Sequence, residues 1–265
     1  MLFLLTCYNF DSPVELKQNG RVDKLLALLR RCYATEAEVQ FRMNQLSAGT
    51  QKDSSADEVT KLQVFTDPTY SKASWVGTLT LSFAQLTGIN AVMFFSSQIF
   101  SDSGMSPFVA IGIINTVNWA ATIGSMGILS FAGKRPVMIA SQFVCILGMF
   151  GLFFFTVVDQ NSGLMLTCCI IFIIAFETGP GPIGWPYVSE ICHGQAVAIA
   201  TMVNWFWCIF VGVLYPFLNG VWLEKGYADL IFVGTSIIGL LFYIIVMKES
   251  RGLTEEQKKR LYMPD

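Results

Sequence analysis

Charge is what this sequence has least of. Only 14% of its 265 residues are Asp, Glu, Lys or Arg, whereas 53% are hydrophobic and the mean hydropathy is +0.54. Soluble domains carry about a quarter charged residues. Four gaps without a charged residue run from Lys72 to Asp102, from Asp102 to Lys134, from Arg135 to Asp159 and from Glu190 to Glu224. Each is longer than the roughly 20 residues that cross a hydrocarbon core. Composition therefore excludes a soluble globule and predicts a polytopic membrane protein.

Clusters of catalytic or metal-binding residues are also missing. The one histidine, His193, has no cysteine at a metal-ligand spacing, and most of the seven cysteines fall in apolar segments, so we expect small buried thiols and no disulfide framework. Pro180 and Gly181 are not followed by the Gly-Lys-Ser/Thr of a phosphate loop. The sequence predicts no enzyme, no metal and no cofactor. With a net charge of −2, it gives nucleic-acid binding no support.

The chain begins with an apolar head and a polar segment. Residues 1–10 lack the basic start and cleavage site of a signal peptide, and we interpret them as the remnant of a preceding transmembrane helix. Residues 11–73 predict a cytoplasmic helical loop, with amphipathic helices around Val22–Leu29 and Glu36–Leu46 and a linker over 47–57. This loop is either a solvated connector or a docking or gating element at the membrane face.

Residues 74–247 predict an all-α bundle of six transmembrane helices, and residues 248–265 a cytoplasmic tail. The third span has few polar groups, so we expect it to face lipid. The six spans are placed at about 74–100, 107–131, 136–157, 163–191, 196–218 and 229–247.

Basic residues are distributed unevenly over the two sides that six spans create. Of the 17 Lys and Arg, nine lie in residues 11–73, two are Lys134 and Arg135, and five follow the last span, which leaves only Lys225 on the other side. Lys and Arg near span ends stay in the cytoplasm. We therefore expect a multi-pass protein in a lipid bilayer, with the plasma membrane as its location and both termini cytoplasmic.

The stretch from Phe176 to Glu190 contains three prolines and three glycines within an apolar span. Proline removes a backbone hydrogen bond, and broken membrane helices occur where the freed backbone lines a cavity or packs on protein. In transporters, such interruptions point to the binding site. The residues that we expect to form the helix break and gate are Gly179, Pro180, Gly181 and Pro182.

Two residues of this stretch have properties of a solute pathway. A carboxylate at the bilayer centre costs about 3 kcal/mol, so Glu177 should face the bundle interior. Trp185 offers an aromatic face that suits a pyranose ring, and interfacial anchoring is the alternative. Glu190 lies nearer the cytoplasmic end, where pairing with Lys134 or Arg135 is more plausible than substrate contact.

Amide side chains occur in three other spans. Gln85 and Asn90 would face one cavity if the helix opened at Gly88, and their amides suit a hydroxyl-rich ligand. The second span places Asn115 and Asn118 among apolar residues, and the fifth contains Asn204. Interhelical hydrogen bonding is the alternative to ligand binding at all of these positions.

The motifs resemble those of the sugar porters of the major facilitator superfamily. Residues 84–90 are similar to the seventh-helix signature Gln-Gln-Leu-Ser-Gly-Ile-Asn, and residues 177–185 to the tenth-helix Glu-x-Gly-Pro-Gly-Pro-Ile-x-Trp. Ile114-Asn115-Thr116, Asn204-Trp205 and residues 249–254 look like motifs of the eighth helix, the eleventh helix and the segment after the twelfth. The resemblance implies the C-terminal six-helix half of a twelve-helix fold, preceded by its cytoplasmic loop.

By this resemblance, a hexose would contact Gln85, Asn90, Asn115, Glu177, Trp185 and Asn204. A cytoplasmic charge network would contain Lys134, Arg135, Glu190, Glu249 and Arg251. Ala84 stands where the signature has its first Gln, and Gly184 where the tenth helix has a further Pro.

These observations favour a carrier of a monosaccharide that works by alternating access, with a second six-helix half or a second copy as partner. Whether transport is passive or coupled to protons stays open. The alternative is a non-transporting protein, such as a truncated half-transporter, a sensor or an assembly partner. A membrane enzyme is the remotest alternative.

Overall fold

The computed structural model describes residues 11–55, 60, 62–101, 106–224 and 226–264, which fall into two compact units, residues 1–59 and 60–265. The described residues form helices and turns, with a single isolated bridge between Asn219 and Leu223 in place of any sheet. The prediction of an all-α fold is confirmed.

The first unit is a short helical segment with its own small core. It contains α2 (Pro13–Gln18), α3 (Val22–Cys32) and α4 (Glu36–Ser55), with Leu25 and Leu29 of α3 buried. The linker expected over residues 47–57 is wrong, because α4 continues to Ser55. No proline interrupts that stretch, and only Gly49 strongly opposes a helix. The expected remnant at residues 1–10 lies outside the described residues.

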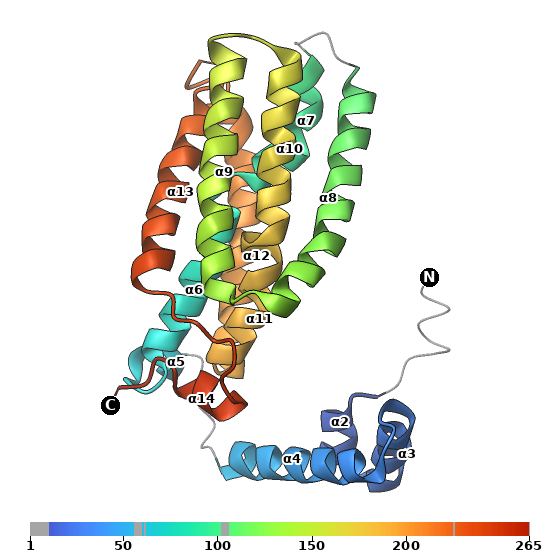
Figure 1. Cartoon of the computed structure of the whole chain (residues 1–265). Helices are drawn as coiled ribbons and strands as arrows, with labels where there is room; N and C mark the ends of the chain where they lie inside the picture. The colour runs from blue at the N-terminus through green and yellow to red at the C-terminus, as the bar shows by residue number, and fades with distance from the viewer. Residues whose placement is uncertain (1–10, 56–59, 61, 102–105, 225, 265) are drawn as a thin grey trace. The chain divides into compact units, whose positions relative to one another are not determined.

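The second unit contains six helical segments long and apolar enough to cross a membrane, so the prediction of six spans is confirmed. Two of these segments, the first and the fourth, are each broken into two helices (Figure 1). The helices of the spans are α6 (Ser71–Gln85) with α7 (Ile89–Ser101), α8 (Pro107–Phe131), α9 (Lys134–Val157), α10 (Ser162–Thr178) with α11 (Pro180–Ile191), α12 (Gly194–Leu218) and α13 (Ala228–Ile245). The short helices α5 (Gln63–Thr66) and α14 (Glu255–Arg260) flank them.

The third span, which we expect to face lipid, has one face packed on protein and one exposed face that contains Phe143, Leu147 and Phe150. Helix α9 packs against both α10 and α13, and Met138, Cys145 and Met149 on it are fully buried. Gly148 lets the backbone of α10 approach, since a Cβ at that position would lie 3.0 Å from the Phe172 nitrogen. A face of small apolar residues packs closely between helices in membranes. Composition alone does not distinguish such a face from one that contacts lipid.

The first break lies between Gln85 and Ile89, where Gly88 has a φ of +91°. That conformation suits glycine, which has no Cβ to clash. The break leaves backbone groups without helical partners, and the hydroxyl of Thr235 on α13 donates to the Leu86 oxygen at 2.6 Å. The neighbouring helix thus stabilises the interruption.

The second break is centred on Gly179, between α10 and α11. Pro180 occupies the first position of α11, where its missing N–H would have no helical partner anyway. Gly179 lies so close to α9 that a Cβ on it would be 2.5 Å from the Cβ of Ser141. Both breaks are therefore packed against protein.

We expect Gly88→Ala to lower the free energy of unfolding by about 2 kcal/mol or more, because it combines an unfavourable positive φ with contacts near 2.8 Å to Phe232. The matched control is Gly124→Ala in α8, where a Cβ meets no atom within 4 Å and alanine favours the helix. Thermal unfolding in detergent measures both. An equal midpoint for the two variants would contradict the strained break.

Candidate functional site

A half-open cavity of about 440 Å³ lies where the two broken spans meet α8 and α12. Its wall combines amides, one carboxylate and tryptophan rings with aliphatic side chains. Ligand sites are mostly apolar hollows with a few convergent polar groups, and this cavity has that composition. The polar and tryptophan side chains on its wall are Gln85, Asn90, Asn118, Thr122, Glu177, Trp185, Asn204 and Trp205.

A chain of amides forms one side of the cavity. The Asn90 amide nitrogen donates to the Gln85 oxygen across the break at Gly88, and Gln85 Nε2 donates to Asn204 Oδ1 at 2.9 Å. Asn204 is only 1% exposed, and its Nδ2 has no partner within the described part of the chain. A buried unsatisfied donor costs about 1–3 kcal/mol, so a ligand oxygen or a water that reached this nitrogen would be stabilising.

The opposite side of the cavity holds Glu177. Its Oε1 accepts a hydrogen bond from Asn118 Nδ2 at 2.9 Å, and its Oε2 accepts one from the Thr122 hydroxyl, also at 2.9 Å. Both donors come from α8. Among the described residues no cation pairs with Glu177, so neutral donors alone hold this carboxylate.

Aromatic and proline side chains complete the wall. Trp185 on α11 is 41% exposed, and Trp205 on α12 also lines the cavity. Pro180, Gly181 and Pro182 form the wall next to Glu177. The second break thus places a flat aromatic surface beside a carboxylate.

The structure brings together most of the sequence-predicted site residues, but not Asn115. The side chain of Asn115 is exposed, bonds back to the Ile111 oxygen at 3.0 Å and does not line the cavity. Asn118, one turn further along α8, takes the position facing Glu177. Gly88 and Gly179 shape the breaks without lining the cavity.

Sequence reasoning missed Thr122 and Trp205 and left Asn118 unassigned. Positions 115, 118 and 122 have the spacing of one helix face, and this spacing is the signal that could have identified Asn118 and Thr122. Residues of the apolar wall carry no such signal. Sequence reasoning also missed Asp229, a buried carboxylate at the start of α13. It is 4% exposed and accepts a hydrogen bond from the Tyr215 hydroxyl at 3.2 Å.

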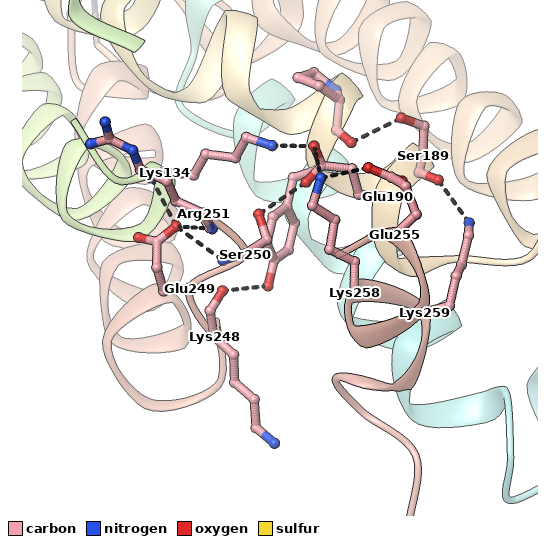
Figure 2. A network of polar contacts seen from close by, with 12 residues as sticks. Lys134, Ser189, Glu190, Lys248, Glu249, Ser250, Arg251, Glu255, Lys258 and Lys259 are labelled. Atoms are coloured by element: carbon pink, nitrogen blue, oxygen red, sulfur yellow. Dashed lines mark hydrogen bonds and ion pairs between the residues drawn. The ribbon is translucent and has the colours of Figure 1, made fainter. Parts of the chain in front are cut away.

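A second polar cluster lies at the end of the bundle where α13 leads into the C-terminal tail with α14. We call it the tail-end network (Figure 2). Glu190 on α11 is its centre. Glu190 Oε1 lies 2.5 Å from Lys134 Nζ and 3.3 Å from Lys258 Nζ, and its Oε2 accepts from the Ser250 hydroxyl at 2.9 Å. Glu190 therefore links α9 and α11 to the chain after α13.

Two other charged residues of the tail-end network cap helix ends. Glu249 accepts the backbone N–H groups of Lys134 and Arg135, at 3.1 and 3.0 Å, at the start of α9. Arg251 donates to the Phe131 oxygen and, at 3.2 Å, to the Ser130 oxygen at the end of α8. Each charge opposes the partial charge of the helix end that it meets.

Arg135 does not pair with Glu190. Its guanidinium donates instead to the Ile244 oxygen at 2.6 Å, near the end of α13. Lys134 and Arg135 are the expected basic partners of Glu190, and only Lys134 lies beside it. Lys258 is a second basic partner that was not expected.

Tyr262 anchors the tail next to this network, which the sequence gave no reason to expect. It is 2% exposed; its hydroxyl lies 2.7 Å from the hydroxyl of Tyr187 on α11 and accepts the Lys248 N–H at 2.8 Å. Burial raises the pKa of Tyr262 above its ordinary value. A hydroxyl that stays protonated can donate and accept in this cluster at neutral pH.

No group of three or more His, Cys, Asp or Glu side chains in the described ranges is arranged to hold a metal ion. The residues that line the cavity offer hydrogen bonds and an aromatic surface. The cavity can hold a neutral polar solute.

The chain matches the family model described as "Sugar (and other) transporter" over residues 1–262. It is 28% identical to mouse solute carrier family 2, facilitated glucose transporter member 3, over 95% of this chain and 52% of that protein. It is 32% identical to the facilitated trehalose transporter Tret1 of Drosophila grimshawi, over 96% of this chain and 28% of that protein. The proton:xylose symporter XylE of E. coli, bound to 6-bromo-6-deoxy-D-glucose, is structurally similar with a TM-score of 0.83 at 22% identity, over 98% of this chain and 56% of that one.

The fold is that of a multi-pass membrane protein, with six helical segments long and apolar enough to cross a membrane. The chain belongs to the sugar transporter family of the major facilitator superfamily, as its motifs indicated. It spans about half the length of the mouse glucose transporter and less of the trehalose transporter.

We expect Glu249→Ala to cost about 1–2 kcal/mol of stability, because it removes the cap of two N–H groups at the start of α9. The control is Glu256→Ala, an exposed carboxylate that pairs with Arg260 at the surface, and its effect should stay within about 0.5 kcal/mol. Chemical or thermal unfolding in detergent measures the difference. Equal effects of the two substitutions would contradict the capping role.

Cysteine labelling provides a test of the cavity. We expect a variant that retains only Cys208, which lines the cavity, to react with a small aqueous methanethiosulfonate reagent. A variant that retains only Cys192 should not react, because that thiol is buried, donates to the Ala73 oxygen and has its pKa raised to about 12 by burial. Modification is measured by mass spectrometry. Protection of both thiols would show that water does not reach the cavity.

Proposed function

We propose that the chain forms one wall of a transmembrane pathway for a hexose-like monosaccharide, which crosses by alternating access. The observation that carries the proposal is a half-open cavity whose wall combines the amide side chains of Gln85, Asn90 and Asn204 with Trp185. A pyranose presents hydroxyls at its rim and C–H groups on its faces. The cavity offers a complement to both.

The chemistry of the amide chain suits neutral hydroxyls. Each hydroxyl both donates and accepts, and the amides of Gln85, Asn90 and Asn204 supply both functions from one side. Aromatic rings supply apolar area with defined geometry. A strongly charged ligand would find only the carboxylate of Glu177, which favours an uncharged solute.

The relatives support a sugar substrate. The names of the matched proteins state glucose, trehalose and xylose as what they transport, and a further relative, from Schizosaccharomyces pombe and 26% identical, is a fructose transporter. Glucose and fructose are hexoses, xylose is a pentose and trehalose is a disaccharide, so the choice of a hexose is part of the proposal. Ala84 on the cavity wall removes an amide that the resembled signature has, so the substrate can differ from that of the relatives.

The two helix breaks support alternating access. Gly88 and Gly179 lie between residues of the cavity, so a rotation at either one changes the cavity without unfolding a span. The tail-end network would hold one arrangement, with Lys134, Arg135, Glu190, Glu249 and Arg251 as its charged members. Separation of α8 and α9 from the tail would break it.

The half-open cavity supports a partner that supplies the opposite wall. We propose a second six-helix half, with a second copy of this chain as the other candidate. We further propose both termini in the cytoplasm, on the distribution of Lys and Arg, and the plasma membrane as the location. Glu177 is the only acidic side chain among the described residues that line the cavity, and it is the group that we propose for any coupling to protons.

A second candidate function is that of a sensor or assembly partner that binds sugar in the same cavity without moving it. Such a protein would retain the cavity but show no uptake with any six-helix half.

Co-expression of the chain with a compatible six-helix half, in cells without other hexose carriers, tests the proposal. We expect uptake of radiolabelled hexose, reduced roughly tenfold by Gln85→Leu or Trp185→Ala at sub-saturating sugar, because each loses about one strong contact. The control is Trp119→Ala on α8, a tryptophan that is 68% exposed and outside the cavity. Sugar uptake that Gln85→Leu and Trp185→Ala leave at the control level would refute this site. Sugar binding without uptake would favour the second candidate.

A further inference from the structure

Each carboxylate oxygen of Glu177 accepts one hydrogen bond from α8, and each oxygen has capacity for a further one. Asn118 and Thr122 bond one oxygen each, at 2.9 Å in both cases. These two donors are four residues apart on α8, so they lie on one face, one above the other. Helix α8 thereby holds the carboxylate as a two-point support.

The bond from Thr122 has a ready substitute. The Thr122 hydroxyl lies 2.8 Å from the Asn118 backbone oxygen as well as 2.9 Å from Glu177 Oε2. A hydroxyl has one hydrogen, so it can donate to only one of these acceptors at a time. If Glu177 turned away, Thr122 would bond its own helix, and no buried donor would be left without a partner.

The position of Glu177 gives this contact leverage over the cavity. Glu177 is the second residue before the break at Gly179, and Pro180 to Trp185 follow it directly on the wall. No other described hydrogen bond of a Glu177 side-chain oxygen leads elsewhere. The contact with α8 therefore fixes the end of α10 at the point where the span is interrupted.

We propose that Asn118 and Thr122 are positioning residues that form a releasable clamp on Glu177, which a sugar hydroxyl displaces when it binds. The clamp is a property of the chain itself, whereas its displacement by sugar rests on the proposed function. A ligand whose hydroxyl draws the carboxylate of Glu177 away from α8 must break these two bonds. Its apparent affinity is then lowered by the fraction of molecules in which the clamp is closed.

This competition gives the clamp a signature that packing lacks. Residues that simply line a site weaken binding when they are truncated. Removal of a clamp instead raises the fraction of molecules whose carboxylate is free, so binding becomes tighter. The direction of the change therefore separates the two roles.

The first experiment needs no ligand. The full chain in lipid nanodiscs is studied by hydrogen exchange over residues 176–181, as wild type, Thr122→Val, Glu177→Met and the double variant. We expect Thr122→Val to speed exchange roughly tenfold, as for the loss of one hydrogen bond to a charged group, and Glu177→Met to speed it more, because it loses both bonds. The double variant should be no faster than Glu177→Met alone. Thr122→Ser, which keeps the hydroxyl, should restore the wild-type rate.

The matched control is Thr116→Val. Thr116 lies on α8 and bonds only its own helix, at 2.8 Å to the Gly112 oxygen, so its loss should leave exchange at the break unchanged. Additive effects of Thr122→Val and Glu177→Met, or an effect of Thr116→Val as large as that of Thr122→Val, would overturn the clamp.

The second experiment titrates the same chains with D-glucose and follows the fluorescence of the cavity tryptophans. We expect Thr122→Val and Asn118→Leu to bind several-fold more tightly than wild type, Thr122→Ser to bind like wild type, and Gln85→Leu to bind more weakly. Weaker binding by Thr122→Val would overturn displacement. An absence of glucose binding by wild type would count against the proposed function, while hydrogen exchange would still decide the clamp.

Discussion

A membrane helix that is interrupted must find partners for the backbone groups it frees, because hydrocarbon supplies none. This constraint organises the second unit. At the first break, Thr235 of α13 satisfies the Leu86 oxygen; at the second, Pro180 has no N–H to satisfy, and Gly179 packs against Ser141 of α9. Helices α9 and α13 thus serve as the support on which both breaks rest. The cavity residues lie on either side of these breaks, so the site exists only because the interruptions are stabilised.

The sequence was sufficient for the spans and the breaks, and insufficient for the contacts between helices. Charge-free gaps reveal a span because charge is costly in lipid, and Gly and Pro reveal a break because they act on their own backbone. Asn115 and Asn118 share one face of α8, and which of them reaches the cavity depends on how far along the helix the broken spans cross it, so Asn115 was expected where the structure has Asn118. The packing of α9 was missed because small apolar residues suit lipid and protein equally. Tyr187 and Tyr262 meet across 75 residues, and no local pattern predicts such a pair.

The tail-end network joins elements that alternating access would have to separate. Glu249 and Arg251 are two residues apart, yet they cap opposite kinds of helix end, the start of α9 and the end of α8. A single short segment after α13 therefore holds the turn between α8 and α9 from both sides. Any motion of that turn away from the tail would break both caps together, along with the contact of Lys134 with Glu190. Such coupled contacts favour two discrete arrangements over a continuous deformation.

The two sides of the cavity differ in what a ligand must rearrange. On the amide side, Asn204 Nδ2 has no partner among the described residues, but it is buried, so a hydroxyl reaches it only if the amide chain opens. On the other side, Glu177 lines the cavity while α8 holds it, so a ligand that draws the carboxylate away must break those bonds. Under the proposed function, loss of the Glu177 bonds would release α8 from the break at Gly179. A ligand that spans both sides could then convert its binding free energy into movement of the helix.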